Sequence, residues 1–171
     1  GVVELRLRGR YLVNVPHQKR WLQLDPGLSP HMEPSIRYET NSAGERGDEG
    51  PADPERTVRI AVVGGSATQC FFVDQLATWP ERIAAVLRER GVPDAMGASG
   101  LHVGNLGQSE LTSHGARLIV RHTLSRYPRL DAVILMFGIS DMLRWLRLGT
   151  PPTVPESTYT DVFYVHPEGP F

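Results

Sequence analysis

Three short runs of small and polar residues are the places in this sequence where chemistry could occur. They are Gly64-Gly65-Ser66, Asn105-Leu106-Gly107 and Gly138-Ile139-Ser140-Asp141. The two glycines before Ser66 let the backbone turn sharply and leave the serine hydroxyl uncrowded. Such a serine can attack a carbonyl carbon when a general base lies close to it. Taken alone, this run is more simply interpreted as a small-residue turn between a strand and a helix.

The sequence predicts no metal and no cofactor. Residues 64–69 match neither G-x-G-x-x-G nor a phosphate-binding loop that ends in Gly-Lys-Ser/Thr. No two histidines have the i, i+4 spacing of a zinc site, and Cys70 is the single cysteine of the sequence. One cysteine excludes a disulfide or a cysteine-based zinc site within these residues.

Each of the three runs follows a stretch that is typical of a β-strand. Residues 58–63 are a compact β-branched run, residues 101–103 lead into the second turn, and residues 132–137 are continuously apolar. The last pattern predicts a strand buried on both faces of a parallel sheet. Because the carboxyl ends of parallel strands share one edge, we expect the three turns to converge on one cleft.

Helices are predicted between these strands. Thr78-Trp79-Pro80-Glu81 has the form of a capping box and begins a predicted helix over residues 79–90. Thr112 or Ser113 can cap a second helix, which Pro128 stops, and a third helix follows the last turn to residue 148. The alternation of strands and helices predicts a parallel sheet with helices on both faces.

Composition limits the class of protein. Of the 171 residues, 40% are hydrophobic and 22% charged, which fits one α/β domain with its own core. A formal net charge of -1 gives no basic field for nucleic acid, and no apolar stretch is long enough to span a bilayer. We interpret residues 1–56 as accessory strands (1–15) and an irregular leader packed on the domain, with a solvated charged connector at 45–56, and residues 57–171 as the domain itself.

The ends of the sequence bear on localisation. The chain begins at Gly1 without a methionine and stops just after a Gly-Pro pair, which suggests that both ends are cut. The compartment therefore stays open, and an extracytoplasmic location or a tether through a missing N-terminal segment is one alternative. The oligomeric state is open as well.

Taken in order, these motifs resemble the SGNH (GDSL-like) hydrolase family. Residues 62–68 (VVGGSAT) are similar to the family's nucleophile segment in its Gly-Gly-Ser variant, and Trp79-Pro80 lies where the family often has this pair. Residues 103–113 and 138–141 look like the second segment and the Gly-x-Asn-Asp segment. The resemblance covers residues 57–149, and residues 41–47 resemble a stretch that precedes the nucleophile strand in some members.

The resemblance implies a fold and an activity. The fold would be α/β, a flavodoxin-like three-layer α/β/α arrangement with a parallel sheet, incomplete at the C-terminus. The activity would be that of a serine esterase or acylhydrolase, which cleaves a small-molecule ester, such as an acetyl ester of a carbohydrate or lipid, through an acyl-enzyme on Ser66. This stretch alone would be inactive.

The resemblance also implies roles for individual residues. The oxyanion hole would draw on Ser66, Gly107, Glu110 and Ser140. The site would be supported by Gly64, Gly65, Asn105, Gly138 and Asp141. The general base would be a histidine of an Asp-x-x-His segment near the C-terminus of the family's domain.

Three departures from the family pattern bear on activity. Ser140 replaces the asparagine that usually donates to the oxyanion, and it is either a shorter donor or a helix N-cap. Glu110 replaces a glycine, so its side chain either strains the turn or swings out to solvent. No aspartate is followed by histidine at the third position, and His166 with Asp161 has the wrong spacing for that role.

These departures keep two other functions open. The first alternative is an SGNH-fold binding or accessory module whose catalysis is impaired. The second is a phosphate or nucleotide binder that uses the same turns at the ends of the strands. It ranks last, because nothing basic stands near those turns.

Overall fold

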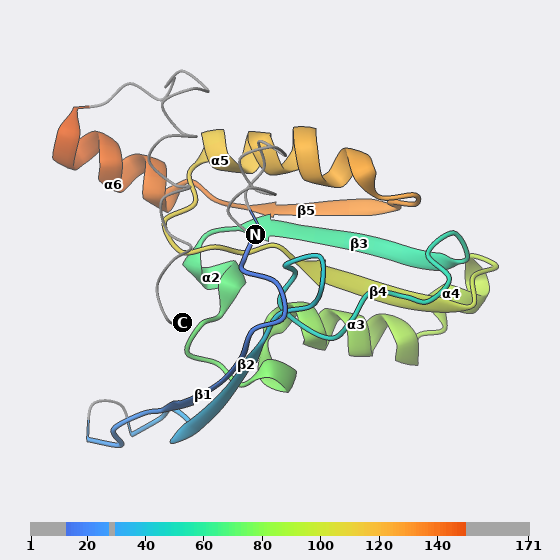
Figure 1. Cartoon of the computed structure of the whole chain (residues 1–171), viewed down its shortest axis with the longest axis horizontal. Helices are drawn as coiled ribbons and strands as arrows, with labels where there is room; N and C mark the ends of the chain where they lie inside the picture. The colour runs from blue at the N-terminus through green and yellow to red at the C-terminus, as the bar shows by residue number, and fades with distance from the viewer. Residues whose placement is uncertain (1–12, 28–29, 150–171) are drawn as a thin grey trace.

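The structure is a computed structural model, and it describes residues 13–27 and 30–149 (Figure 1). The accessory strands predicted within residues 1–15 therefore lie almost entirely outside the described residues. No helix in the described part of the chain is long and apolar enough to cross a membrane.

A parallel sheet of three strands forms the centre of the molecule. Its strands are β3 (Thr57–Gly64), β4 (Gly100–Asn105) and β5 (Ala132–Met136), in the order β4-β3-β5. All run parallel, with Val62 paired to Asn105 on one side and to Ile134 on the other. The three predicted strands and their direction are thus confirmed.

Helices cover both faces of this sheet (Figure 1). One face carries α3 (Trp79–Glu89) and the short α4 (Val92–Ala95). The other carries α5 (Ser113–Leu118), which continues as a π-helical turn (Ile119–Thr123) and a 3-10 turn (Leu124–Arg126). The predicted fold class, a parallel α/β sheet between helical layers, is confirmed.

The alternation of side chains along β3 explains why the sheet is covered twice. Ala61 and Val63 pack with Ile119 of the α5 layer, whereas Ile60 and Val62 pack with Ala84 of α3. Every residue of β3 is buried, as expected for the central strand of a parallel sheet. This buried strand fixes the position of the turn that follows it.

Strand β5 differs from its prediction. Its continuous apolar run predicted burial on both faces, yet Val133 is 39% exposed and Leu135 is 52% exposed. These side chains are exposed because β5 lies at the edge of the sheet that the described residues form. The prediction of a strand is confirmed, and the prediction of its burial is wrong.

The capping box at the start of α3 is also absent. The helix begins at Trp79 as predicted, but the Thr78 side chain makes no cap hydrogen bond. Its hydroxyl instead donates to the carbonyl of Gln75, 3.2 Å away in the preceding turn. A competing local acceptor therefore overrides the capping pattern.

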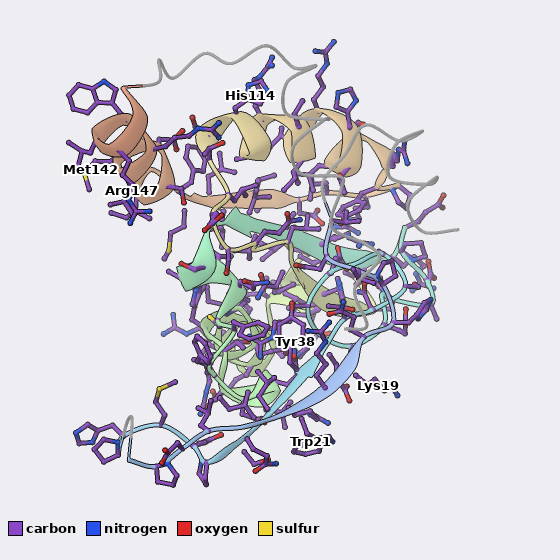
Figure 2. The ribbon with its side chains drawn as sticks, turned by 60° about the vertical axis from the view of Figure 1, so that its left-hand side comes forward. Lys19, Trp21, Tyr38, His114, Met142 and Arg147 are labelled. Carbon is purple, nitrogen blue, oxygen red and sulfur yellow. The ribbon has the colours of Figure 1, made fainter. Side chains whose placement is uncertain are left out.

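The leader is more regular than its composition indicates. Strands β1 (Lys19–Gln23) and β2 (Ser35–Glu39) form an antiparallel hairpin where an irregular segment was predicted. Tyr38 lies on the side of the hairpin that faces the domain, whereas Lys19 and Trp21 point outward (Figure 2). The Tyr38 ring packs against Phe71, with centroids 5.1 Å apart. Residues 35–39 do alternate between polar and apolar types, but residues 19–23 (KRWLQ) do not, and the Pro- and Gly-rich composition around both obscured the pattern.

The last described helix, α6 (Ile139–Leu148), follows β5 and projects from the sheet (Figure 1). Its apolar side chains are largely exposed, with Trp145 at 59% and Leu146 at 64%. The first turn of α6 is the part of the helix that contributes residues to the candidate site.

Candidate functional site

Ser66 lies at the tip of the central strand. Strand β3 ends at Gly64, and the four-residue helix α2 (Ser66–Gln69) begins after Gly65. Ser66 is exposed, whereas the two glycines before it are buried. The turn therefore holds the serine at the carboxyl edge of the sheet with its side chain accessible to solvent.

Backbone hydrogen bonds bring the three turns together. The Gly65 amide donates to the carbonyl of Met136, which ends β5, at 3.2 Å. The Gln108 amide, just after the second turn, donates to the carbonyl of Gly64 at 2.9 Å. The three runs that sequence reasoning singled out thus lie side by side.

Two of the glycines are required by close packing. A Cβ at Gly64 would lie 2.3 Å from the carbonyl oxygen of Met136, and one at Gly107 would lie 2.3 Å from the amide nitrogen of Gln69. Both distances are far below van der Waals contact, and the neighbouring atoms are backbone atoms that cannot swing away. Glycine at both positions lets α2 sit directly against the neighbouring strand ends.

Asn105 joins the second turn to α2. It is buried at the end of β4, and its Nδ2 donates to the carbonyl of Thr68 at 2.9 Å. Its Oδ1 accepts from the Gly107 amide at 2.9 Å. The Gly107 amide is therefore engaged within the turn, which leaves the Glu110 amide as the free candidate for an oxyanion donor from this segment.

Glu110 adopts the backbone conformation of the glycine that it replaces. Its φ is 62°, in the left-handed region that side chains with a Cβ rarely occupy, and its side chain is exposed. The predicted outward orientation of the Glu110 side chain is confirmed. The other interpretation, a strained turn, holds as well.

We expect Glu110→Gly to stabilise the protein by about 1 kcal/mol, because glycine adopts this φ without a steric cost. Urea denaturation of the two proteins measures the difference. Glu110→Gln is the matched control, since it removes the charge but keeps the Cβ, and it should leave the free energy of unfolding unchanged. An equal gain in both variants would assign the effect to charge and not to the backbone.

The third turn places Ser140 beside the nucleophile turn. Its Oγ lies 4.0 Å from the position that a Cβ on Gly65 would take. The N-cap of α6 is Gly138, at a φ of 126° that requires glycine, so the alternative of Ser140 as N-cap is wrong.

Asp141 accepts hydrogen bonds from the amide and hydroxyl of Ser113, at 2.7 to 3.0 Å, and so ties α6 to α5.

A histidine base for Ser66 is not found in the part of the chain that the structure describes. None of the histidines within residues 13–27 and 30–149 is hydrogen-bonded to Ser66, and His166 lies outside them. Cys70, one helical turn beyond Ser66, is half-buried, and burial raises the pKa of its thiol. A raised thiol pKa disfavours the reactive thiolate at neutral pH.

Sequence reasoning missed two buried charges in the leader. Glu45 and Arg46 are 0% and 1% exposed, although the charge-dense segment that they begin was predicted to be a solvated connector. The Glu45 carboxylate accepts from Asn41 and His102 at 2.9 Å, from Arg59 at 2.8 Å and from the Tyr127 hydroxyl. The only signal in the sequence was the resemblance of residues 41–47 to a stretch of the family.

The environment of Glu45 favours its charged form. Burial alone would raise the pKa of this carboxyl, but the hydrogen bond and charge of His102 and the charge of Arg59 outweigh it and lower the pKa to about 2. Glu45 also lies against Gly104, where a Cβ would be 2.3 Å from its Oε1. The pairing holds the leader against β4.

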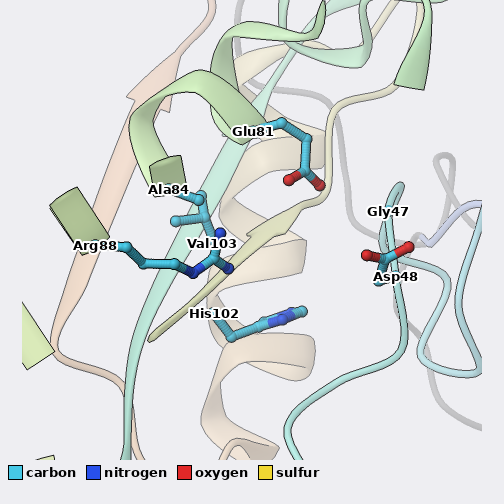
Figure 3. A pocket seen from close by; sticks show the side chains of 7 residues that line it. All are labelled: Gly47, Asp48, Glu81, Ala84, Arg88, His102 and Val103. Atoms are coloured by element: carbon cyan, nitrogen blue, oxygen red, sulfur yellow. The ribbon is translucent and has the colours of Figure 1, made fainter. Parts of the chain in front are cut away.

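A small cavity of about 40 Å³ lies beside this cluster (Figure 3). It opens between β4, α3 and the leader, and is lined by Gly47, Asp48, Glu81, Ala84, Arg88, His102 and Val103. Burial and the neighbouring Asp48 charge raise the pKa of Glu81. No group of three or more histidine, cysteine or acidic side chains among the described residues is arranged to hold a metal. Because the cavity lies along β4 and not at the strand ends, we do not assign it to the candidate site.

Comparisons with solved structures give a partial likeness. Among solved structures, the chain is similar to AlinE4, an SGNH-hydrolase family esterase, at 20% sequence identity and a TM-score of 0.44. Two variants of that esterase match at 20% and 19% identity with the same TM-score. Each match covers 57% of this chain and 46% of the other, so the chain spans less than half the length of these structures. No family model matches the sequence, and no curated protein matches it.

Proposed function

We propose that this chain supplies the nucleophile and part of the oxyanion hole of a serine ester hydrolase. The observation that carries the proposal is the position of Ser66, exposed at the tip of the central strand and flanked by the ends of β4 and β5. In open parallel sheets this edge is where reacting groups gather. The resemblance of the three turns to SGNH segments supports the same assignment.

The proposed reaction has two steps. Ser66 Oγ bonds to the acyl carbon of a small-molecule ester, its proton passes to a general base, and the alcohol leaves with a proton. Water then attacks the acyl-enzyme and releases the acid and the free serine. Because no described histidine is hydrogen-bonded to Ser66, we place the base outside residues 13–27 and 30–149.

Donors for the developing oxyanion come from three positions in this proposal. They are the Ser66 amide, the Glu110 amide and the Ser140 hydroxyl, while Gly107 supports the turn through its close packing on α2. Donors held in place before the reaction stabilise the transition state without a reorganisation cost.

Covalent labelling tests the proposal. The full-length protein that contains this chain should react with a fluorophosphonate, and mass spectrometry should find the adduct on the peptide that carries Ser66. The label should disappear in Ser66→Ala and persist in Ser125→Ala, which removes another exposed serine. Labelling that is absent from the parent protein, or unchanged in Ser66→Ala, would remove the enzyme assignment.

We expect Ser140→Ala to lower kcat about tenfold, with KM nearly unchanged, since the loss affects a donor that acts in the transition state. The effect should fall below the hundredfold or more of an optimal donor, because a hydroxyl reaches less far than a carboxamide. Ser140→Asn should recover or exceed the parent kcat. Steady-state hydrolysis of a short-chain p-nitrophenyl ester measures both variants, and an unchanged kcat in Ser140→Ala would exclude the role.

An SGNH-like binding module is the second candidate. The observation that favours it is the absence of a histidine partner for Ser66 among the described residues, together with the strained Glu110 turn. Such a module would bind an ester without releasing alcohol. Product release by the full-length protein, followed by chromatography, distinguishes the two functions.

A further inference from the structure

The helix that carries Ser66 is too short to hold itself in place. Helix α2 has four residues and forms a single turn, in which the Thr68 and Gln69 amides donate to the Gly65 carbonyl and the Cys70 amide donates to the Ser66 carbonyl. An isolated turn of this length is unstable, because the entropy cost of fixing its backbone exceeds the gain from the few hydrogen bonds of a single turn. The position of Ser66 must therefore be set by groups outside the helix.

Side chains from elsewhere bind the carbonyl groups of this helix and of the turn after it. Trp79 Nε1 donates to the Ala67 carbonyl at 2.9 Å, and Asn105 Nδ2 donates to that of Thr68. The next carbonyls along the chain, those of Gln69 and Cys70, both accept from Nη1 of Arg46. Carbonyls at a helix end need such partners when they are buried.

Arg46 makes more of these bonds than any other described residue near α2. Its Nη2 donates to the Val73 carbonyl at 2.6 Å, and its Nε donates to Gln75 Oε1 at 3.1 Å. The guanidinium lies over the Tyr38 ring, 4.6 Å from the centroid. A planar fork with several fixed donors suits a bent loop of carbonyls, which one ammonium group cannot match.

The backbone of Arg46 is anchored at the second turn of the candidate site. Its amide donates to the carbonyl of Asn105 at 2.7 Å, and the two residues form an antiparallel bridge at the end of β4. Arg46 is 1% exposed, so its side chain does not reach solvent or any substrate that occupies the cleft. One residue thus links the end of β4 to the helix that begins with Ser66.

We propose that Arg46 is a positioning residue that holds α2, and through it the Ser66 nucleophile, in register with the second and third turns. The inference rests on the proposed function, since it assigns Arg46 to the same site. It predicts that loss of the guanidinium slows the chemistry on Ser66 without changing the affinity for substrate, because Arg46 touches only protein groups.

Arg46→Lys is the first test, made in the full-length protein. Lysine keeps the charge but cannot reach the carbonyls of Gln69, Cys70 and Val73 together. The rate constant for fluorophosphonate labelling of Ser66 and kcat should both fall about tenfold to a hundredfold per folded molecule, with KM within about twofold, as for a displacement of the nucleophile of about 1 Å. The folded fraction is measured by circular dichroism at the assay temperature.

Arg59→Lys is the matched control. Arg59 is also buried, at 6% exposed, but it donates to Glu45 and has no hydrogen bond to α2. This variant should be less stable than the parent, yet its folded molecules should be labelled at the parent rate. Equal slowing in the two arginine variants would show a general loss of stability and overturn the positioning role.

The outcomes separate this inference from the proposed function. If the parent is labelled on Ser66 and Arg46→Lys is labelled at the same rate, the positioning role is overturned and the hydrolase proposal stands. If the parent is not labelled, both fail. If Arg46→Lys does not fold, Gln75→Met is the second test. This variant removes the acceptor of Arg46 Nε and leaves the bonds of Arg46 to the three carbonyls in place. Labelling should slow by about threefold or more, whereas an unchanged rate would overturn the inference.

Discussion

Ser66→Ala is expected to lower kcat for ester hydrolysis by at least about a thousandfold while leaving the fold intact. Removal of a catalytic serine leaves only binding and the oxyanion donors, which accounts for losses of this size or larger. The free energy of unfolding should change by less than about 0.5 kcal/mol, because Ser66 is exposed and its removal leaves no buried group without a partner. Steady-state kinetics and urea denaturation of the full-length protein measure the two quantities.

The combination of the two results matters more than either alone. A large loss of kcat with unchanged stability places Ser66 in the chemistry. A loss of kcat that follows a loss of stability would instead make Ser66 a structural residue of the turn. A variant with the parent kcat would contradict the assignment of the nucleophile.

Glu45→Gln is expected to destabilise the protein by about 3 to 5 kcal/mol. The substitution keeps the shape of the side chain but removes the negative charge that pairs with Arg59 and His102 inside the protein. Breaking a buried pair leaves the remaining charge uncompensated, which is the reason for the size of the effect. Urea denaturation measures the loss. Glu89→Gln, the same change at an exposed helix position, should be nearly neutral.

Glu45 also predicts how stability depends on pH. Its pKa is about 2 in the folded protein, below the ordinary value of 4.5, so the folded state favours the charged form. The stability that this carboxylate contributes is fully present above pH 4.5 and is lost as the pH falls toward 2. A shift of this size corresponds to about 3 kcal/mol. Glu45→Gln should flatten the unfolding free energy in this range, and an equally steep loss in both proteins would show that other carboxyls cause it.

The elements of the sheet could be predicted because their patterns are local. The β-branched run before Gly64 and the periodic face after Trp79 gave β3 and α3 within one or two residues of their observed ends. The exposure of β5 could not be predicted in this way. A continuous apolar run describes what a strand can bury, but the neighbours that cover it come from other parts of the sheet.

The buried charges of the leader were beyond local patterns for a related reason. A run that begins Glu45-Arg46 is usually solvated, and its one close neighbour that binds the Glu45 carboxylate, Asn41, carries no charge to balance it. The partners of Glu45 include His102 and Tyr127, 57 and 82 residues away in the chain. Burial of such a charge is determined by the tertiary fold, so only the assembled structure shows it.

The candidate site was predicted in outline and corrected in detail. The glycines marked the close approaches at Gly64 and Gly107, since glycine is the residue that permits them. The Gly107 amide donates to Asn105 Oδ1, and this bond depends on the side-chain rotamer of Asn105. The spacing of residues along the sequence does not predict a rotamer. The N-cap of α6 fell on Gly138 and not on Ser140, because the strand ends in a conformation that only glycine adopts easily.

The central claim is that Ser66 shares one cleft with the ends of the neighbouring strands, where it reacts with an acyl group. A crystal structure of the full-length protein after reaction with a dialkyl fluorophosphonate tests this claim most directly. We expect a covalent bond from Ser66 Oγ to phosphorus, with the phosphoryl oxygen within about 3 Å of the Ser66 amide nitrogen and of Ser140 Oγ. An adduct on another residue, or a phosphoryl oxygen directed away from both donors, would contradict the claim.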